Sequence, residues 1–276
     1  MIRVELVKLL RRPRTWVTVG LLCALPVLVA VFLAVSHLAP PPGRGPAFLS
    51  AVLNNGSLYP AAAMAMVMPI FLPIAVAVLA GDSIAGEATT GTLRYLLVRP
   101  VGRTRLLVAK LITLTVFVLL AIVAVVGTSY AAGTMLLGNA PPAAVGEAGG
   151  VTSLSGAPLT PTQLAVRVLA TIGFITVSML GVASIALFLS TLTDSALGAG
   201  LGALAVVITS DVLVTLDAAG SVQPYLPTRY WLAWIDFFRD PVFWRDIERG
   251  LLLQAVYVGV LLLASWANFM TRDVTS

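Results

Sequence analysis

Charged residues are scarce in this chain of 276 residues. Asp, Glu, Lys and Arg make up 11% of it, against 59% for the hydrophobic residues, whereas soluble domains carry about 25% charged residues. The apolar residues are gathered into runs of about 20, the length that crosses a hydrocarbon core of about 30 Å. The composition excludes an ordinary soluble domain and predicts an all-α polytopic membrane protein.

Residues that build common catalytic and metal sites are also few. A single cysteine, Cys23, excludes an intrachain disulfide, and a single histidine, His37, is too few for a histidine-based metal site. Neither Lys8 nor Lys110 belongs to a G-x-x-x-x-G-K-[ST] loop, and no G-x-S-x-G elbow occurs. We therefore expect no catalytic residue, no metal and no cofactor bound by this chain, which is not predicted to be an enzyme.

The apolar runs predict one transmembrane domain with six spans, at about 16–38, 60–80, 106–137, 168–192, 196–216 and 251–271. The first run is longer than a signal-peptide core of roughly 7–15 residues, so we interpret it as a retained span. Pro69 and Pro73 lie inside the second span and predict a kink, because proline has no amide hydrogen to donate.

The fifth span contains two features of interest. Gly198 and Gly202 form a G-x-x-x-G pair, which favours close helix packing within the bundle or between subunits. Asp211 is the one acidic residue inside a predicted span, and such residues are candidates for a role in transport. Its place near the outer third of the span equally allows simple access to water.

Positive charge is distributed unevenly over the connecting segments. With the N-terminus in the cytoplasm, eleven of the 17 Lys and Arg residues lie on inner segments. Short loops rich in Lys and Arg stay on the cytoplasmic side of a membrane. We therefore expect a cell-membrane protein with both termini in the cytoplasm, and bilayer orientation explains the net charge of +5 better than nucleic-acid binding.

Residues 1–15 have the pattern of an amphipathic interfacial helix that Pro13 ends. Apolar residues fall on one side and charged residues on the rest, an arrangement suited to the surface of an anionic membrane. Either orientation alone or an added partner contact would explain it. The apolar residues are Ile2, Leu6, Leu9 and Leu10, and the charged ones include Glu5, Lys8, Arg11 and Arg12.

The last outer segment, 217–249, carries eight of the 21 aromatic residues, mixed with charges. Amphipathic rings settle at headgroup depth, so the segment predicts a short helix in the outer interface. An anchoring belt and a role in substrate exit both fit this composition.

Segment 81–105 joins spans two and three and holds two carboxylates and four arginines. A helix from Ser83 to Val98, capped by Asp82 or Ser83, would place Glu87, Gly91 and Arg94 on one face before Pro100 ends it. A docking surface for a partner outside the membrane and a plain connecting helix both fit this pattern.

The order Gly81-Asp82-x4-Glu87-x3-Gly91-Thr92-Leu93-Arg94-x5-Pro100-x2-Arg103-x6-Lys110 resembles the cytoplasmic segment of the ABC-2 type transporter permeases. Three further stretches are similar to this family: Glu5-Leu-x-Lys8 followed by arginines, Leu226-Pro-Thr-x-Tyr-Trp231, and Asn268-Phe-x-x-Arg272-Asp273.

This resemblance implies a permease subunit of an ATP-binding cassette exporter. A separate P-loop ATPase, holding ATP and Mg, would dock on the cytoplasmic segment with help from the N-terminal helix. Two permease subunits, identical or homologous, would form the path through the lipid membrane. The coupling residues carried over by position are Asp82, Glu87, Gly91, Thr92, Arg94, Pro100, Arg103 and Lys110.

The apolar spans favour a hydrophobic or amphipathic cargo such as a drug, an antibiotic, a peptide or a lipid. Two other functions stay open: an ion-coupled secondary transporter, and a membrane scaffold or sensor subunit that transports nothing.

Overall fold

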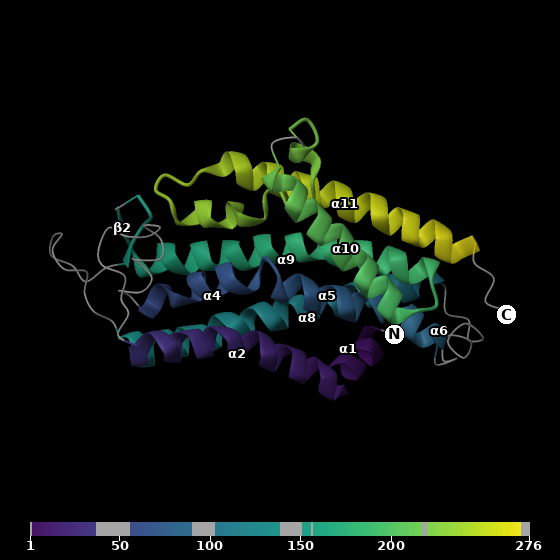
Figure 1. Ribbon diagram of the computed structural model, residues 1–276, viewed down its shortest axis with the longest axis horizontal. Helices are drawn as coiled ribbons and strands as arrows, with labels where there is room; N and C mark the ends of the chain where they lie inside the picture. The colour runs from purple at the N-terminus through teal and green to yellow at the C-terminus, as the bar shows by residue number, and fades with distance from the viewer. Residues whose placement is uncertain are drawn as a thin grey trace.

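The computed structural model describes residues 2–36, 56–89, 103–138, 151–155, 157–216 and 220–271. Within these ranges, long helices lie side by side in an elongated bundle (Figure 1). Five of them are long and apolar enough to cross a membrane. They are α2 (Pro13–Ser36), α8 (Arg103–Ala132), α9 (Pro161–Leu192), α10 (Ala196–Thr215) and α11 (Trp244–Thr271). The prediction of an all-α polytopic membrane protein is confirmed.

The second predicted span is two helices, α4 (Tyr59–Val67) and α5 (Phe71–Gly81), which meet at 53°. If this bent pair is one span, the described residues contain six candidate crossings, the number predicted. Pro69 lies in the break, and Pro73 lies in the first turn of α5. The predicted kink is confirmed, and its cause is the missing proline amide.

Side-chain caps set two helix starts. Thr160 and Gln163 form a reciprocal capping box, with bonds of 2.9 and 3.2 Å, so α9 begins at Pro161, before the predicted span. The Ser195 hydroxyl accepts from the Gly198 amide at 3.0 Å and starts α10. The long α8 continues into a π-turn, η2 (Gly133–Leu137).

Helices α5 and α10 approach closely at two glycines. A Cβ placed on Gly81 would lie 2.6 Å from the Gly200 backbone nitrogen, so a side chain cannot fit there. Gly200, between the two glycines of the predicted packing pair, therefore makes the contact between these helices. Gly202 faces the Leu189 side chain on α9, whereas Gly198 is exposed in this chain and does not pack within the bundle.

The aromatic segment does form a short helix, the 3₁₀ helix η5 (Trp231–Phe238), which follows η4 (Gln223–Tyr225). Most of its aromatic rings are buried within the protein, whereas the rings of an anchoring belt would face the membrane interface. Trp234 has no exposed surface, and Phe237 makes edge-to-face contacts with Phe174 of α9 and Trp244 of α11. The rings of η5 mainly fill the protein core, and Tyr225, Phe243 and Trp244 remain exposed.

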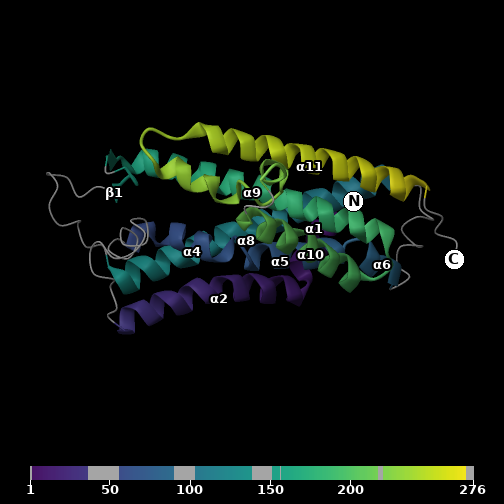
Figure 2. The same cartoon turned by 45° about the horizontal axis from the view of Figure 1, so that its top comes forward.

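The two ends of the bundle differ. A two-stranded antiparallel sheet of β1 (Val151–Thr152) and β2 (Pro158–Leu159) lies at one end, near η1 (Gly56–Leu58) and the start of α9 (Figure 1). Helix α1 (Ile2–Arg11), the short helix α6 (Ala85–Thr89) and the end of α11 lie at the other (Figures 1 and 2). Of the helix predicted for 83–98, α6 is the part that the structure describes.

Candidate functional site

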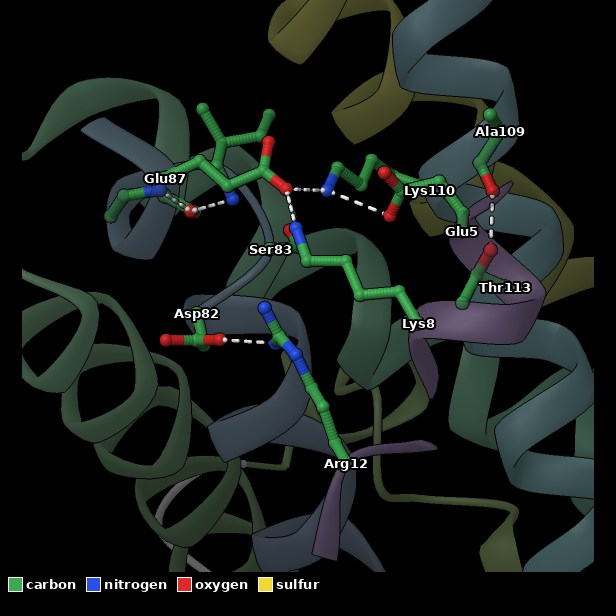
Figure 3. Close-up of polar contacts among 12 residues, drawn as sticks. Glu5, Lys8, Arg12, Asp82, Ser83, Glu87, Ala109, Lys110 and Thr113 are labelled. Carbon is green, nitrogen blue, oxygen red and sulfur yellow. Dashed lines mark hydrogen bonds and ion pairs between the residues drawn. The ribbon is translucent and has the colours of Figure 1, made fainter. Parts of the chain in front are cut away.

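The charged residues at the α1 end of the bundle meet in one cluster. Seven residues make up what we call the charge cluster: Glu5, Lys8, Arg12, Arg14, Asp82, Glu87 and Lys110. They come from α1, the α1–α2 junction, the start of α2, the α5–α6 turn, α6 and α8. Figure 3 shows most of these side chains pointing toward one another. Residues far apart in the sequence are thus joined at one place.

Lys110 is the centre of the cluster. Its ammonium nitrogen lies 2.9 Å from Glu5 Oε2 and 2.6 Å from Glu87 Oε1. The three side chains are at most 9% exposed. Taking charges out of water is costly, and such an arrangement persists only when every charge has a partner at good distance. One lysine on α8 therefore holds α1 and α6 in a defined position.

A second layer of ion pairs surrounds this centre. Lys8 also pairs with Glu87, from the more exposed side. Arg12 lies 3.2 Å from Asp82, and Arg14 pairs with the same carboxylate. Two guanidinium groups thus share one carboxylate, which leaves excess positive charge at the beginning of α2.

Glu87 stays ionised although it is buried. Burial raises the pKa of a carboxyl group, but the ammonium groups of Lys110 and Lys8 outweigh that effect and hold the pKa of Glu87 below its usual 4.5. The carboxylate is consequently an acceptor for both lysines at neutral pH.

The turn that carries Asp82 and leads into α6 is fixed by a serine on α9. The Ser190 hydroxyl donates to the Gly81 carbonyl at 2.7 Å and accepts from the amides of Ile84 at 3.2 Å and Ala85 at 2.8 Å. These bonds satisfy a carbonyl that the end of α5 leaves open and two amides at the start of α6. The segment is therefore attached to α9 as well as to α8.

Helix α1 packs against the bundle with Leu9 and Glu5, which are buried. Glu5 is buried because Lys110 supplies its partner, while Ile2 and Leu10 are 40% and 44% exposed. Exposed apolar side chains suit the predicted place of this helix at the membrane surface, which stays a prediction.

The structure gathers six of the predicted site residues and adds one. Glu5, Lys8, Arg12, Asp82, Glu87 and Lys110 meet in the charge cluster, and Arg14 joins them. In the sequence Arg14 contributed only to the count of positive charge. Its place directly after Pro13, at a helix start beside the other arginines, was the available signal.

The remaining predicted residues lie elsewhere. Arg11 is exposed on α1, and Asp211 is exposed on α10, away from the charge cluster. Arg103 is the first residue of α8. Gly91, Thr92, Arg94 and Pro100 lie outside the described residues, so their predicted coupling role stays a prediction.

The cluster leaves little room for a ligand. The space among its side chains amounts to about 40 Å³, about the volume of one water molecule in the liquid. Within the described ranges, no group of three His, Cys, Asp or Glu residues could hold a metal ion. The arrangement is suited to holding helices together.

Comparison with known proteins identifies the family. The family model described as "ABC-2 family transporter protein" matches residues 1–210, which include the whole charge cluster, the helices from α1 to α9 and most of α10. No curated protein sequence matches the chain significantly. The similar stretches at 226–231 and 268–273 lie beyond the matched residues and remain a resemblance. Because the match covers most of the chain and the helices are those of a multi-pass membrane protein, this protein belongs to the ABC-2 transporter family, as the membrane permease component of an ABC transporter.

Proposed function

We propose that this chain is an exporter permease that couples to a separate P-loop ATPase through segment 81–100 and helix α1. The ATPase binds ATP and Mg, and its closure moves the α6 segment. Permeases of this family generally work with an ATPase subunit. Two permease chains, identical or homologous, form the path across a cell membrane, with both termini in the cytoplasm.

The observation that carries this proposal is the linkage of three elements by Lys110. A push on α6 displaces Glu87, which is held by α8 through Lys110 and by α1 through Lys8. Movement therefore passes from the charged segment to the long helix α8. The side chains of Glu87 and Lys110 are buried, so these residues act by holding the helices in place. Arg11 and Arg12 are more exposed and are therefore more available to the partner.

The chain's apolar interior supports a hydrophobic or amphipathic cargo. A cavity of about 390 Å³ lies between α4, α8, α9 and η5. Its walls include Met64, Ile122, Ile175 and Trp234, and they are almost entirely apolar. Drugs, antibiotics, peptides with apolar side chains and lipids fit such a surface better than a free ion does.

The coupling is tested by co-purification with a P-loop ATPase, to be sought first in the neighbouring reading frames. We expect Glu87→Lys and Arg94→Glu to abolish co-purification and stimulated ATP turnover. Asp211→Asn, on exposed α10, is the control that leaves them unchanged. Wild-type levels of binding and turnover in all variants would refute the coupling role.

The two alternatives predict different behaviour in vesicles. An ion-coupled secondary transporter moves cargo under an ion gradient without ATP, and Asp211→Asn should then abolish transport. A scaffold or sensor subunit binds the ATPase but moves no cargo. Cargo movement that requires ATP and the ATPase subunit, and that survives Asp211→Asn, supports the exporter.

A further inference from the structure

An apolar groove runs along the first membrane span. Its volume is about 700 Å³, and residues of α2, α5 and α8 form its walls. Helix α2 lies along one edge of the bundle, beside α8 (Figures 1 and 2). Leu21, Leu28 and Val78 line the groove and are 68%, 68% and 53% exposed. The groove is therefore open toward the surroundings of this chain.

One end of the groove is positively charged. Arg14 is part of its wall, and within the described lining residues it is the only one that carries a charge. Arg14 shares the Asp82 carboxylate with Arg12, so that one negative charge faces two positive ones. Arg14 is half exposed, which leaves its guanidinium accessible to a second anion.

The charged end lies at the depth expected of lipid headgroups. Trp16 is 52% exposed and donates its indole hydrogen to the Leu10 carbonyl at 2.8 Å. Partly exposed tryptophan and arginine at the start of a span are typical of the membrane interface. From Arg14 to Leu28 the groove extends roughly 20 Å along α2 at 1.5 Å per residue, comparable with one leaflet of about 15 Å.

We propose that an anionic phospholipid occupies this groove, with its phosphate on Arg14 and an acyl chain between α2 and α5. Two arginines and one aspartate leave one positive charge uncompensated, and the phosphate neutralises it. The acyl chain covers the exposed leucine and valine side chains of the groove. Basic pockets between membrane helices bind anionic headgroups in this manner.

A second copy of the chain fits the groove less well. A two-fold contact places the same patch on both partners, so that a groove with one positive and no negative lining residue would face its own like charge. A neutral headgroup would leave the excess positive charge uncompensated. The anionic lipid is thus the occupant that both the charge and the apolar walls favour.

This proposal goes beyond the exporter function and does not depend on it, since binding is measured on the permease alone. The purified full-length chain in detergent is titrated with dioctanoyl phosphatidylglycerol and, separately, with dioctanoyl phosphatidylcholine, and bound lipid is counted by native mass spectrometry. We expect the anionic lipid to bind about five- to tenfold more tightly, the effect of one accessible arginine.

Two variants distinguish the contribution of the lipid headgroup to binding from that of the acyl chain. Arg14→Gln should remove the preference for phosphatidylglycerol, whereas Arg11→Gln, an exposed arginine outside the groove, should keep it. Leu21→Trp fills the groove and should weaken the binding of both lipids. Gly20→Trp is its matched control, because Gly20 is exposed, is not part of the wall and has open space around its Cβ position.

Four results would overturn the proposal. They are equal binding of the two lipids by the wild type, an unchanged preference in Arg14→Gln, and displacement of phosphatidylglycerol by millimolar inorganic phosphate, which would mean an anion site without an acyl chain. The fourth is a Leu21→Trp chain that binds both lipids normally but changes its oligomeric state, which would assign the groove to a second copy. Circular dichroism verifies that each variant retains its helices.

Discussion

Lys110 illustrates how a membrane protein uses a buried charge. The residue lies on α8, and its ammonium group is shared by carboxylates of two other helices. A buried ion pair is a weak source of stability by itself, because desolvation offsets the attraction. Its value here is positional: α1 and α6 can occupy one arrangement that satisfies all three charges.

Removing Lys110 should therefore be costly. Lys110→Met leaves Glu5 and Glu87 buried without this partner, and such changes cost about 3–5 kcal/mol. Thermal unfolding in detergent measures the loss. The control is Lys8→Met, whose side chain is 35% exposed. Its loss should be smaller, because Glu87 keeps Lys110 as a partner. Equal losses for the two lysines would contradict the central role of Lys110.

Acid should release the same contacts. The pKa of Glu87 is lowered in the folded protein, so the carboxylate contributes stability that is present above its ordinary value of 4.5. That contribution is lost as pH falls through the lower folded pKa. The thermal midpoints of wild type and Glu87→Gln, measured against pH, should differ above 4.5 and converge below it. A constant difference down to the acid limit would rule out this linkage.

At the scale of helices, the contact of α5 with α10 depends on backbone meeting backbone. Gly81 and Gly200 allow this, and Ser190 bonds the same turn from α9. In lipid, helices gain little from burying apolar surface, so close packing and hydrogen bonds decide which helices associate. The position of α6, and with it the charge cluster, thus depends on residues that carry no charge.

Substitution of Gly81 tests this dependence. Gly81→Ala puts a methyl group 2.6 Å from the Gly200 nitrogen, and overpacking of this kind costs about 1–3 kcal/mol. Gly173→Ala is the control, because its Cβ position has no neighbour within 4 Å. The thermal midpoint should fall for the first and stay or rise for the second. A tolerated Gly81→Ala would mean that α5 and α10 are further apart.

At the scale of the whole molecule, the charge cluster and the β1–β2 sheet define opposite ends of the bundle (Figure 1). The distribution of Lys and Arg predicts that the cluster end faces the cytoplasm. The proposed coupling requires this orientation, because ATP and the ATPase are cytoplasmic. The two ends of α9 provide positions at which it can be measured.

Cysteine labelling in intact cells checks the orientation. In a Cys23→Ala background, Thr162→Cys at the start of α9 should react with an impermeant maleimide. Asp194→Cys, exposed after the end of α9, should react only once the membrane is opened. The reverse pattern would place the charge cluster outside the cell and remove the coupling proposal.

Much of the architecture could be predicted because it depends on local properties. Apolar run length specified the membrane helices, and Pro69 specified the bend between α4 and α5. Part of the charge cluster was predicted individually, since Glu87 and Lys110 belong to a recognisable spacing. Their mutual contact was not predicted, because residues on different helices meet only through the rotation and depth of each helix. The burial of Glu5 on α1 was not predicted either, because its partner Lys110 lies 105 residues away in the sequence.

The sequence alone determined that this protein is a helical membrane bundle and that its second span bends, since these follow from residues close together in the chain. Only the tertiary structure decided that Glu5 turns inward to Lys110, that Gly200 and not Gly198 meets α5, and that Arg14 joins the cluster at the head of a groove. In a lipid environment apolar faces can point either way, so buried charge pairs and backbone contacts between helices select the final arrangement.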